Sequence, residues 1–94
     1  METLYCSKIF EDLKSNKVCM EYFKIFTEVF TNNSAQKRLY GIKIKKYIND
    51  KLFEEDCESR ITEDERCINS LINSMANGMV TPSSFISVID DFIV

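Results

Sequence analysis

The stretch Lys17-Val-Cys-Met-Glu-Tyr-Phe-Lys-Ile-Phe-Thr-Glu-Val-Phe-Thr31 carries the clearest hydrophobic pattern in the chain, and it decides the predicted fold. At 100° per residue its apolar side chains gather on one side, opposite Glu21, Lys24 and Glu28. This spacing predicts an amphipathic helix over residues 17–31, with its aromatic stripe in a hydrophobic core. The apolar set is Val18, Cys19, Tyr22, Phe23, Ile25, Phe26, Val29 and Phe30.

The flanking segments also show helical spacing. On the N-terminal side, apolar residues recur at helical intervals over residues 4–14 and predict a first helix. On the C-terminal side, residues 31–34 are typical of a turn, and Ser34 is a candidate cap for a helix over residues 35–53. Gly41 separates two apolar stripes there, so this helix is either buried on two sides or broken near the glycine.

The tetrapeptide Ile42-Lys43-Ile44-Lys45 alternates between apolar and charged residues, as a short strand does. The alternation stops at Lys46, and no second strand with turn residues is evident to pair with it. We therefore favour a helix for this segment.

Helix boundaries are clearer in the C-terminal third. Residues 54–60 form an acidic connection, and Thr62-Glu-Asp-Glu65 has the pattern of a capping box for a helix that ends at Asn77-Gly78. Gly78 is expected to take the left-handed conformation of a helix C-terminus. Thr81 is the expected cap of a last helix over 82–93, with Pro82 at its first position. The sequence thus predicts an all-α bundle of about five helices in a single domain, residues 1–94.

Composition excludes several classes of function. The chain has 94 residues, a net charge of −3 and no histidine, which removes Ser/His and Cys/His nucleophile pairs and most zinc sites. No phosphate-binding glycine loop and no calcium-loop motif is present. We expect a protein that is not an enzyme, with no cofactor and no metal ion.

The four cysteines lack metal-ligand spacing, and three of them lie among apolar positions, as free thiols do. No signal peptide and no apolar run long enough to span a bilayer is evident. We expect an intracellular protein of the cytoplasm or nucleus that does not bind membranes.

The apolar arcs of the predicted helices are wider than packing in a small bundle requires, and this surplus predicts a protein-interaction surface. We expect an adaptor or regulator whose apolar groove binds a helix or peptide of another protein, or a second copy of the chain. The predicted partner-binding residues are Ile25, Phe26, Met79, Ile86 and Ile93.

Charge is polarised along the chain: residues 37–51 are basic and residues 54–65 are acidic. The predicted electrostatic face consists of Lys43, Lys45, Lys46, Glu54 and Glu55, which would orient the protein partner. As an alternative, the lysines of residues 37–51 and the interleaved tyrosines would bind nucleic-acid phosphates and bases in an accessory protein. An enzyme whose site is completed by a partner is a third alternative.

The stretch from Ile68 to Phe92 runs helix, Asn77-Gly78, Val80-Thr81, four residues to Phe85, helix. Over about a quarter of the chain it resembles the middle of the TAF homology domain of transcription cofactors, which implies a helical fold. The two further helices and the proline-bearing segment of that family do not follow, and no residue takes a role from it. The length and helix count are also similar to those of death-fold adaptors, which are six-helix bundles.

Overall fold

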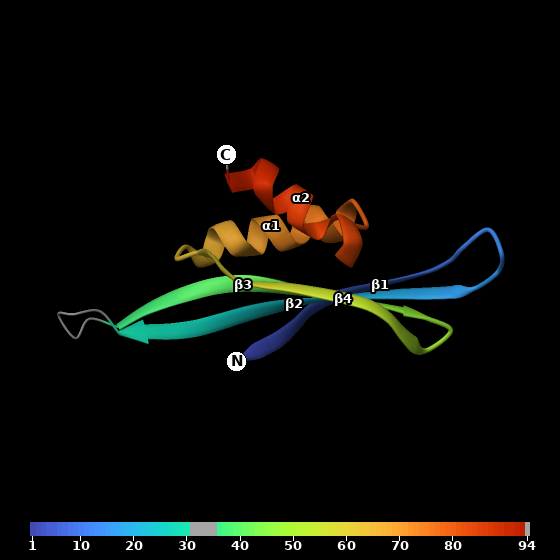
Figure 1. Cartoon of the computed structure of the whole chain (residues 1–94), viewed down its shortest axis with the longest axis horizontal. Coiled ribbons are helices and arrows are strands. Elements are labelled where there is room, and N and C mark those ends of the chain that lie inside the picture. The colour runs from blue at the N-terminus through green and yellow to red at the C-terminus, as the bar shows by residue number, and fades with distance from the viewer. Residues whose placement is uncertain (31–35, 94) are drawn as a thin grey trace.

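The computed structural model describes residues 1–30 and 36–93, and it shows a four-stranded antiparallel sheet followed by two helices (Figure 1). The strands pair in chain order, β1-β2-β3-β4, and both helices lie on the same face of the sheet. The elements are β1 (Glu2–Glu11), β2 (Lys17–Phe30), β3 (Gln36–Ile48), β4 (Lys51–Thr62), α1 (Glu65–Asn77) and α2 (Pro82–Ile93).

The predicted all-α bundle of five helices is therefore wrong. The segments 4–14, 17–31 and 35–53, predicted as helices, belong mainly to β1, β2, β3 and the start of β4, and the acidic connection 54–60 is part of β4. The predicted turn at 31–34 with its cap lies outside the described residues. Only the last two predicted helices are confirmed, as α1 and α2.

β2 alternates between the two faces of the sheet, as a strand must. Val18, Met20 and Tyr22 are buried on the helix-covered face of the sheet, whereas the residues between them point to the opposite face. That opposite face also carries apolar side chains, among them Phe23 and Ile25, so the period of two is blurred in the sequence. β-branched and aromatic residues, which favour strands, make up most of the segment.

Residues of opposite charge lie opposite each other where the acidic β4 pairs with the basic β3. The register places Lys45 directly opposite Glu55 and Lys46 opposite Glu54. Directly opposed charges of opposite sign stabilise a strand pair by about 0.2–1 kcal/mol each. The acidic segment thus becomes a strand although its residues have low intrinsic strand propensity.

The turn between β1 and β2 and the turn between β3 and β4 lie at the same end of the sheet. Asn49 and Asp50 both have positive φ, 51° and 69°, as the two central residues of a type I′ hairpin turn require. In the turn between β1 and β2, the Asp12 carboxylate accepts hydrogen bonds from the backbone N–H groups of Lys14 and Asn16. The amide oxygen of Asn49 accepts from the Lys17 N–H at 2.9 Å and links the two hairpins.

At Gly41 the backbone of β4 lies too close to β3 to leave space for a side chain. A Cβ atom built on it would overlap the carbonyl oxygen of Glu58 and lie 2.5 Å from the Cα atom of Ser59. The β3–β4 register shifts at this point, between Tyr40 and Ile42. The glycine is therefore required by the irregularity in β4, and it does not mark a break in a helix.

The helix ends differ from the predictions in detail. Asp64, and not Thr62, caps α1, and its side chain accepts from the N–H of Arg66. Gly78 has φ −85°, and the left-handed position belongs to Met79, with φ 51°. Pro82 opens α2 as predicted.

The core lies between the helices and one face of the sheet. Its buried members come from β2, β3, α1 and α2: Met20, Tyr22, Tyr40, Ile42, Ile44, Ile68, Leu71, Ile72, Met75, Ala76, Phe85 and Ile89. The segment that resembles the TAF homology domain is indeed a helix pair, but it packs on a sheet, so the helical fold implied by that family, and by death-fold adaptors, is wrong. Neither helix of the described part of the chain has the length and apolar character needed to cross a membrane.

Candidate functional site

A groove separates the two helices on the covered face of the sheet. α1 contacts all four strands and α2 contacts β3 and β4, whereas in the described residues the Cα atoms of the two helices stay more than 8 Å apart. The space between them has a volume of about 330 Å³. We call it the interhelical groove; it is lined by Ser70, Leu71, Ser74, Val88 and Asp91.

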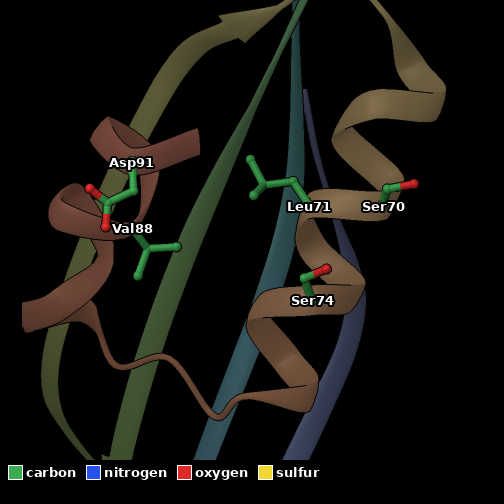
Figure 2. A pocket seen from close by; sticks show the side chains of 5 residues that line it. All are labelled: Ser70, Leu71, Ser74, Val88 and Asp91. Atoms are coloured by element: carbon green, nitrogen blue, oxygen red, sulfur yellow. The ribbon is translucent and has the colours of Figure 1, made fainter. Parts of the chain in front are cut away.

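Figure 2 shows that the groove is walled by one apolar side chain from each helix. Leu71 of α1 and Val88 of α2 point toward each other across it. Ser70 and Ser74, one turn apart, lie on the α1 side, and Asp91 lies on the α2 side. Leu71 is only 4% exposed and Val88 is half-buried, so Val88 supplies most of the accessible apolar surface of the groove. The groove therefore suits an apolar side chain with polar or charged neighbours.

The electrostatics of the groove favour a cation. Asp90 and Asp91 lie in the last turn of α2, which contains no basic residue. The C-terminal end of a helix carries a partial negative charge, so carboxylates there are unfavourable. Among the residues that the structure describes, neither carboxylate forms an ion pair with a lysine or arginine.

Four hydrogen bonds attach α1 and the residues that follow it to the sheet. The Tyr22 hydroxyl donates to the carbonyl oxygen of Val80 at 2.9 Å, and Asn73 donates to the Tyr5 hydroxyl at 3.2 Å. Lys24 donates to Glu65 at 2.8 Å and to Asn69 at 3.1 Å. The hydrogen bond and the charge of Lys24 lower the pKa of the Glu65 carboxyl.

The predicted partner-binding residues do not form one site. Ile25 lies half-buried on the face of the sheet without helices, whereas Phe26 lies on the helix-covered face and packs against the core. Met79, 47% exposed, lies in the connection between the helices. Ile86, 43% exposed, is on α2 but does not line the interhelical groove. The side chain of Ile93 lies outside the described residues.

The predicted electrostatic face is divided between the two faces of the sheet. Lys43, Lys45 and Glu55 share the helix-free face with Ile25, and Lys46 and Glu54 lie on the other. The lysines have partners within the chain. Lys43 forms an ion pair with Glu2 at 3.4 Å, and the ammonium groups of Lys45 and Lys46 lie 5.5 and 5.3 Å from the ring centres of Phe23 and Phe53.

The residues that line the groove were not predicted as a site. Leu71 and Val88 give a sequence signal only as members of apolar helix faces, and Ser70 and Ser74 show no pattern of their own. That the helices stand apart depends on how each one packs on the strands, which helix periodicity alone does not contain.

Three of the four thiols have pKa values shifted away from those of reactive nucleophiles. Burial raises the pKa of the Cys6, Cys19 and Cys57 thiols, so they are protonated near neutral pH. In the part of the chain that the structure describes, no three carboxylate or thiol groups lie together as metal ligands.

Comparison with known protein families gives a match over the whole sequence. The family model described as "Family of unknown function (DUF6514)" matches residues 1–94. No curated protein and no solved structure matches the chain.

Proposed function

The chain belongs to DUF6514, a family of unknown function, and we propose that it is a non-catalytic protein-interaction module that binds a basic amphipathic helix of another protein. The partner helix lies in the interhelical groove. Its apolar side chain packs between Leu71 and Val88, and a neighbouring lysine or arginine reaches Asp91.

The observation that carries this proposal is the combination of apolar walls with carboxylates at the C-terminal end of α2, where the helix dipole disfavours negative charge. Burying an apolar side chain between Leu71 and Val88 stabilises the complex through the hydrophobic effect. A cation beside Asp91 offsets the unfavourable position of this carboxylate in the helix dipole. An acidic partner would also bury an apolar side chain, but it would bring no cation to the carboxylate.

The chemistry of the side chains supports a role without catalysis. The chain has no histidine, and the thiols with a resolved pKa shift are shifted away from reactivity. All four cysteines are free thiols, the state that the reducing cell interior maintains. We therefore assign the module to the inside of the cell, in the cytoplasm or nucleus.

The arrangement of charge disfavours the alternative, nucleic-acid binding by residues 37–51. Lys37, Lys43 and Arg38 form ion pairs with acidic residues of the same chain, and Lys45 lies between Glu21 and Glu55 in the register. A phosphate would have to replace these acidic neighbours. Counterion release would therefore contribute little to the free energy of nucleic-acid binding.

The test uses two synthetic helical peptides with leucines at positions i, i+3, i+4 and i+7, one with lysines elsewhere and one with glutamates. We expect the leucine/lysine peptide to bind in a fluorescence anisotropy titration and the leucine/glutamate peptide not to bind. Val88→Ser should weaken binding by at least ~10-fold, because it removes one apolar wall. Ile86→Ser is the matched control on the same helix, and it should leave the affinity unchanged.

Equal binding of the two peptides would contradict the role of Asp90 and Asp91. Equal effects of Val88→Ser and Ile86→Ser would contradict the groove as the binding site. Circular dichroism of both variants must show the wild-type content of strand and helix, since a loss of fold would also abolish binding.

A further inference from the structure

The face of the sheet opposite the helices is uncovered in the described residues and carries apolar side chains (Figure 1). Phe23, Ile25 and Tyr47 are half-buried there, and Ile9 and Leu52 are 64% and 52% exposed at the two edges. A solvated face of an antiparallel sheet is normally polar. Apolar residues gathered in this way indicate a surface that another molecule covers.

The strand register arranges this face in rows across the four strands, because directly opposed residues point to the same side. The first row is apolar, the second is charged or polar, and the third and fourth mix the two kinds. From β1 to β4 they are Ile9–Cys19–Tyr47–Leu52, Ser7–Glu21–Lys45–Glu55 and Leu4–Phe23–Lys43–Cys57, followed by Glu2–Ile25–Gly41 on the first three strands.

We propose that a second copy of this chain covers the face, related to the first by a two-fold axis that runs parallel to the strands between β2 and β3. Two sheets related in this way pack face to face, ~10 Å apart and within ~30° of parallel. The axis places β2 of one copy over β3 of the other, and β1 over β4. Each β2 residue of a row then meets its own cross-strand neighbour on β3, and each β1 residue meets the β4 residue at the other end of its row.

The rows are complementary to themselves under this axis. Glu21 of one copy meets Lys45 of the second copy, so opposite charges face each other twice. At the edges, Ile9 of β1 meets the exposed Leu52 of β4. Glu21 and Lys45 therefore match in charge, and Ile9 and Leu52 match in apolar character, along the same axis.

Charge and area also favour a second copy over a charged partner. The charges of Lys43 and Glu2 are compensated within the chain by their ion pair at 3.4 Å, so the face has little net attraction for a polyanion or polycation. The molecule measures 55 × 26 × 18 Å along its principal axes. Its broad side has room for the ~800 Å² per partner that a stable interface buries.

This inference is independent of the proposed function, because the interhelical groove lies on the other side of the sheet and stays open in the dimer. A dimer would present two grooves facing away from each other.

The test mixes two charge-reversal variants, Glu21→Lys and Lys45→Glu. Alone, each variant places like charges opposite each other twice, and we expect its dimer to dissociate at least ~100-fold more readily than the wild type in sedimentation velocity. In the mixed heterodimer both contacts are again between opposite charges. The mixture should therefore form a dimer again. Because mixing leaves the contacts within each chain unchanged, this recovery would report on the contacts between the two copies.

The matched control is Glu28→Lys, which reverses a similar cross-strand charge, opposite Arg38, on the helix-covered face. This variant should dimerise like the wild type. Thermal melts show whether each variant is folded. A monomeric wild type, or a mixture that stays monomeric, would overturn the proposal, and a dimer that neither charge reversal weakens would show that the copies pair through another surface.

Discussion

The hydroxyl of Tyr22 donates a hydrogen bond of 2.9 Å to the carbonyl oxygen of Val80, and this contact joins the middle of β2 to the connection between α1 and α2. Val80 in turn donates its N–H to Met75 in α1. The contact therefore ties the end of α1 to the sheet just before α2 begins. It helps to set the distance between the helices, and hence the width of the groove.

Replacing Tyr22 with Phe should destabilise the protein. The tyrosine is fully buried, and the substitution leaves the Val80 carbonyl without its partner. A fully buried unsatisfied acceptor costs about 1–3 kcal/mol, and Val80 is half-buried, so we expect a loss near the lower end of this range in the free energy of unfolding by urea at neutral pH. A change well below this range would show that solvent reaches the carbonyl.

The same tyrosine makes stability sensitive to alkaline pH. Burial raises the pKa of Tyr22 from 10.0 to about 12. Because the folded state favours the neutral phenol, this contribution is fully present below pH 10 and is lost as the pH rises through 12. Between about pH 8 and about pH 11, the wild type should lose more stability than the Tyr22→Phe variant. Equal losses of unfolding free energy in the two proteins would contradict a contribution of Tyr22 ionisation.

Gly41 and Gly78 should respond differently to alanine. A Cβ atom on Gly41 would overlap the backbone of β4, so Gly41→Ala forces the strands apart and costs ~1–3 kcal/mol or more. At Gly78, φ is −85° and the nearest atom to a Cβ, the Ser74 oxygen, is 3.4 Å away. Gly78→Ala should therefore be tolerated. Melting temperatures of the two variants make the comparison, and equal values would contradict the close approach of β4.

Asn49 contributes both a positive φ and side-chain hydrogen bonds, and two substitutions distinguish these contributions. Its backbone has positive φ, and its side chain accepts from the Lys17 N–H and donates to Asn16. Asn49→Gly keeps the backbone conformation and loses only the side-chain hydrogen bonds. Asn49→Ala loses both and should be less stable than the glycine variant by about 1 kcal/mol. Equal stability in urea unfolding would mean that the turn is not of type I′.

The helices could be predicted from the sequence because their signals are local. Pro82 at a first helical position and an acidic start before α1 have the same meaning in any fold. The strands could not be recognised by periodicity alone. In β2 the uncovered face carries Phe23 and Ile25 beside the buried Tyr22, so both faces are apolar and a helical arc fits the pattern as well as an alternating one does.

Other signals did favour strands and were outweighed. The alternation of Ile42 to Lys45 is real, and its pairing strands are the two adjacent segments. Asn49-Asp50 between two apolar runs is a hairpin signal that locates the turn. The candidate site, too, could be predicted only in part. The sequence indicates surplus apolar surface, whereas the groove between Leu71 and Val88 depends on the spacing of two helices on a sheet.

The central claim, that the interhelical groove binds a basic amphipathic helix, is tested most directly by a ¹H–¹⁵N NMR titration of the protein with the leucine/lysine peptide. We predict that the largest shift changes fall on the amides of residues 70–74 and 88–91. Changes centred on the strands of the helix-free face, around Phe23 and Lys43, would contradict the claim, as would a spectrum that the peptide leaves unchanged.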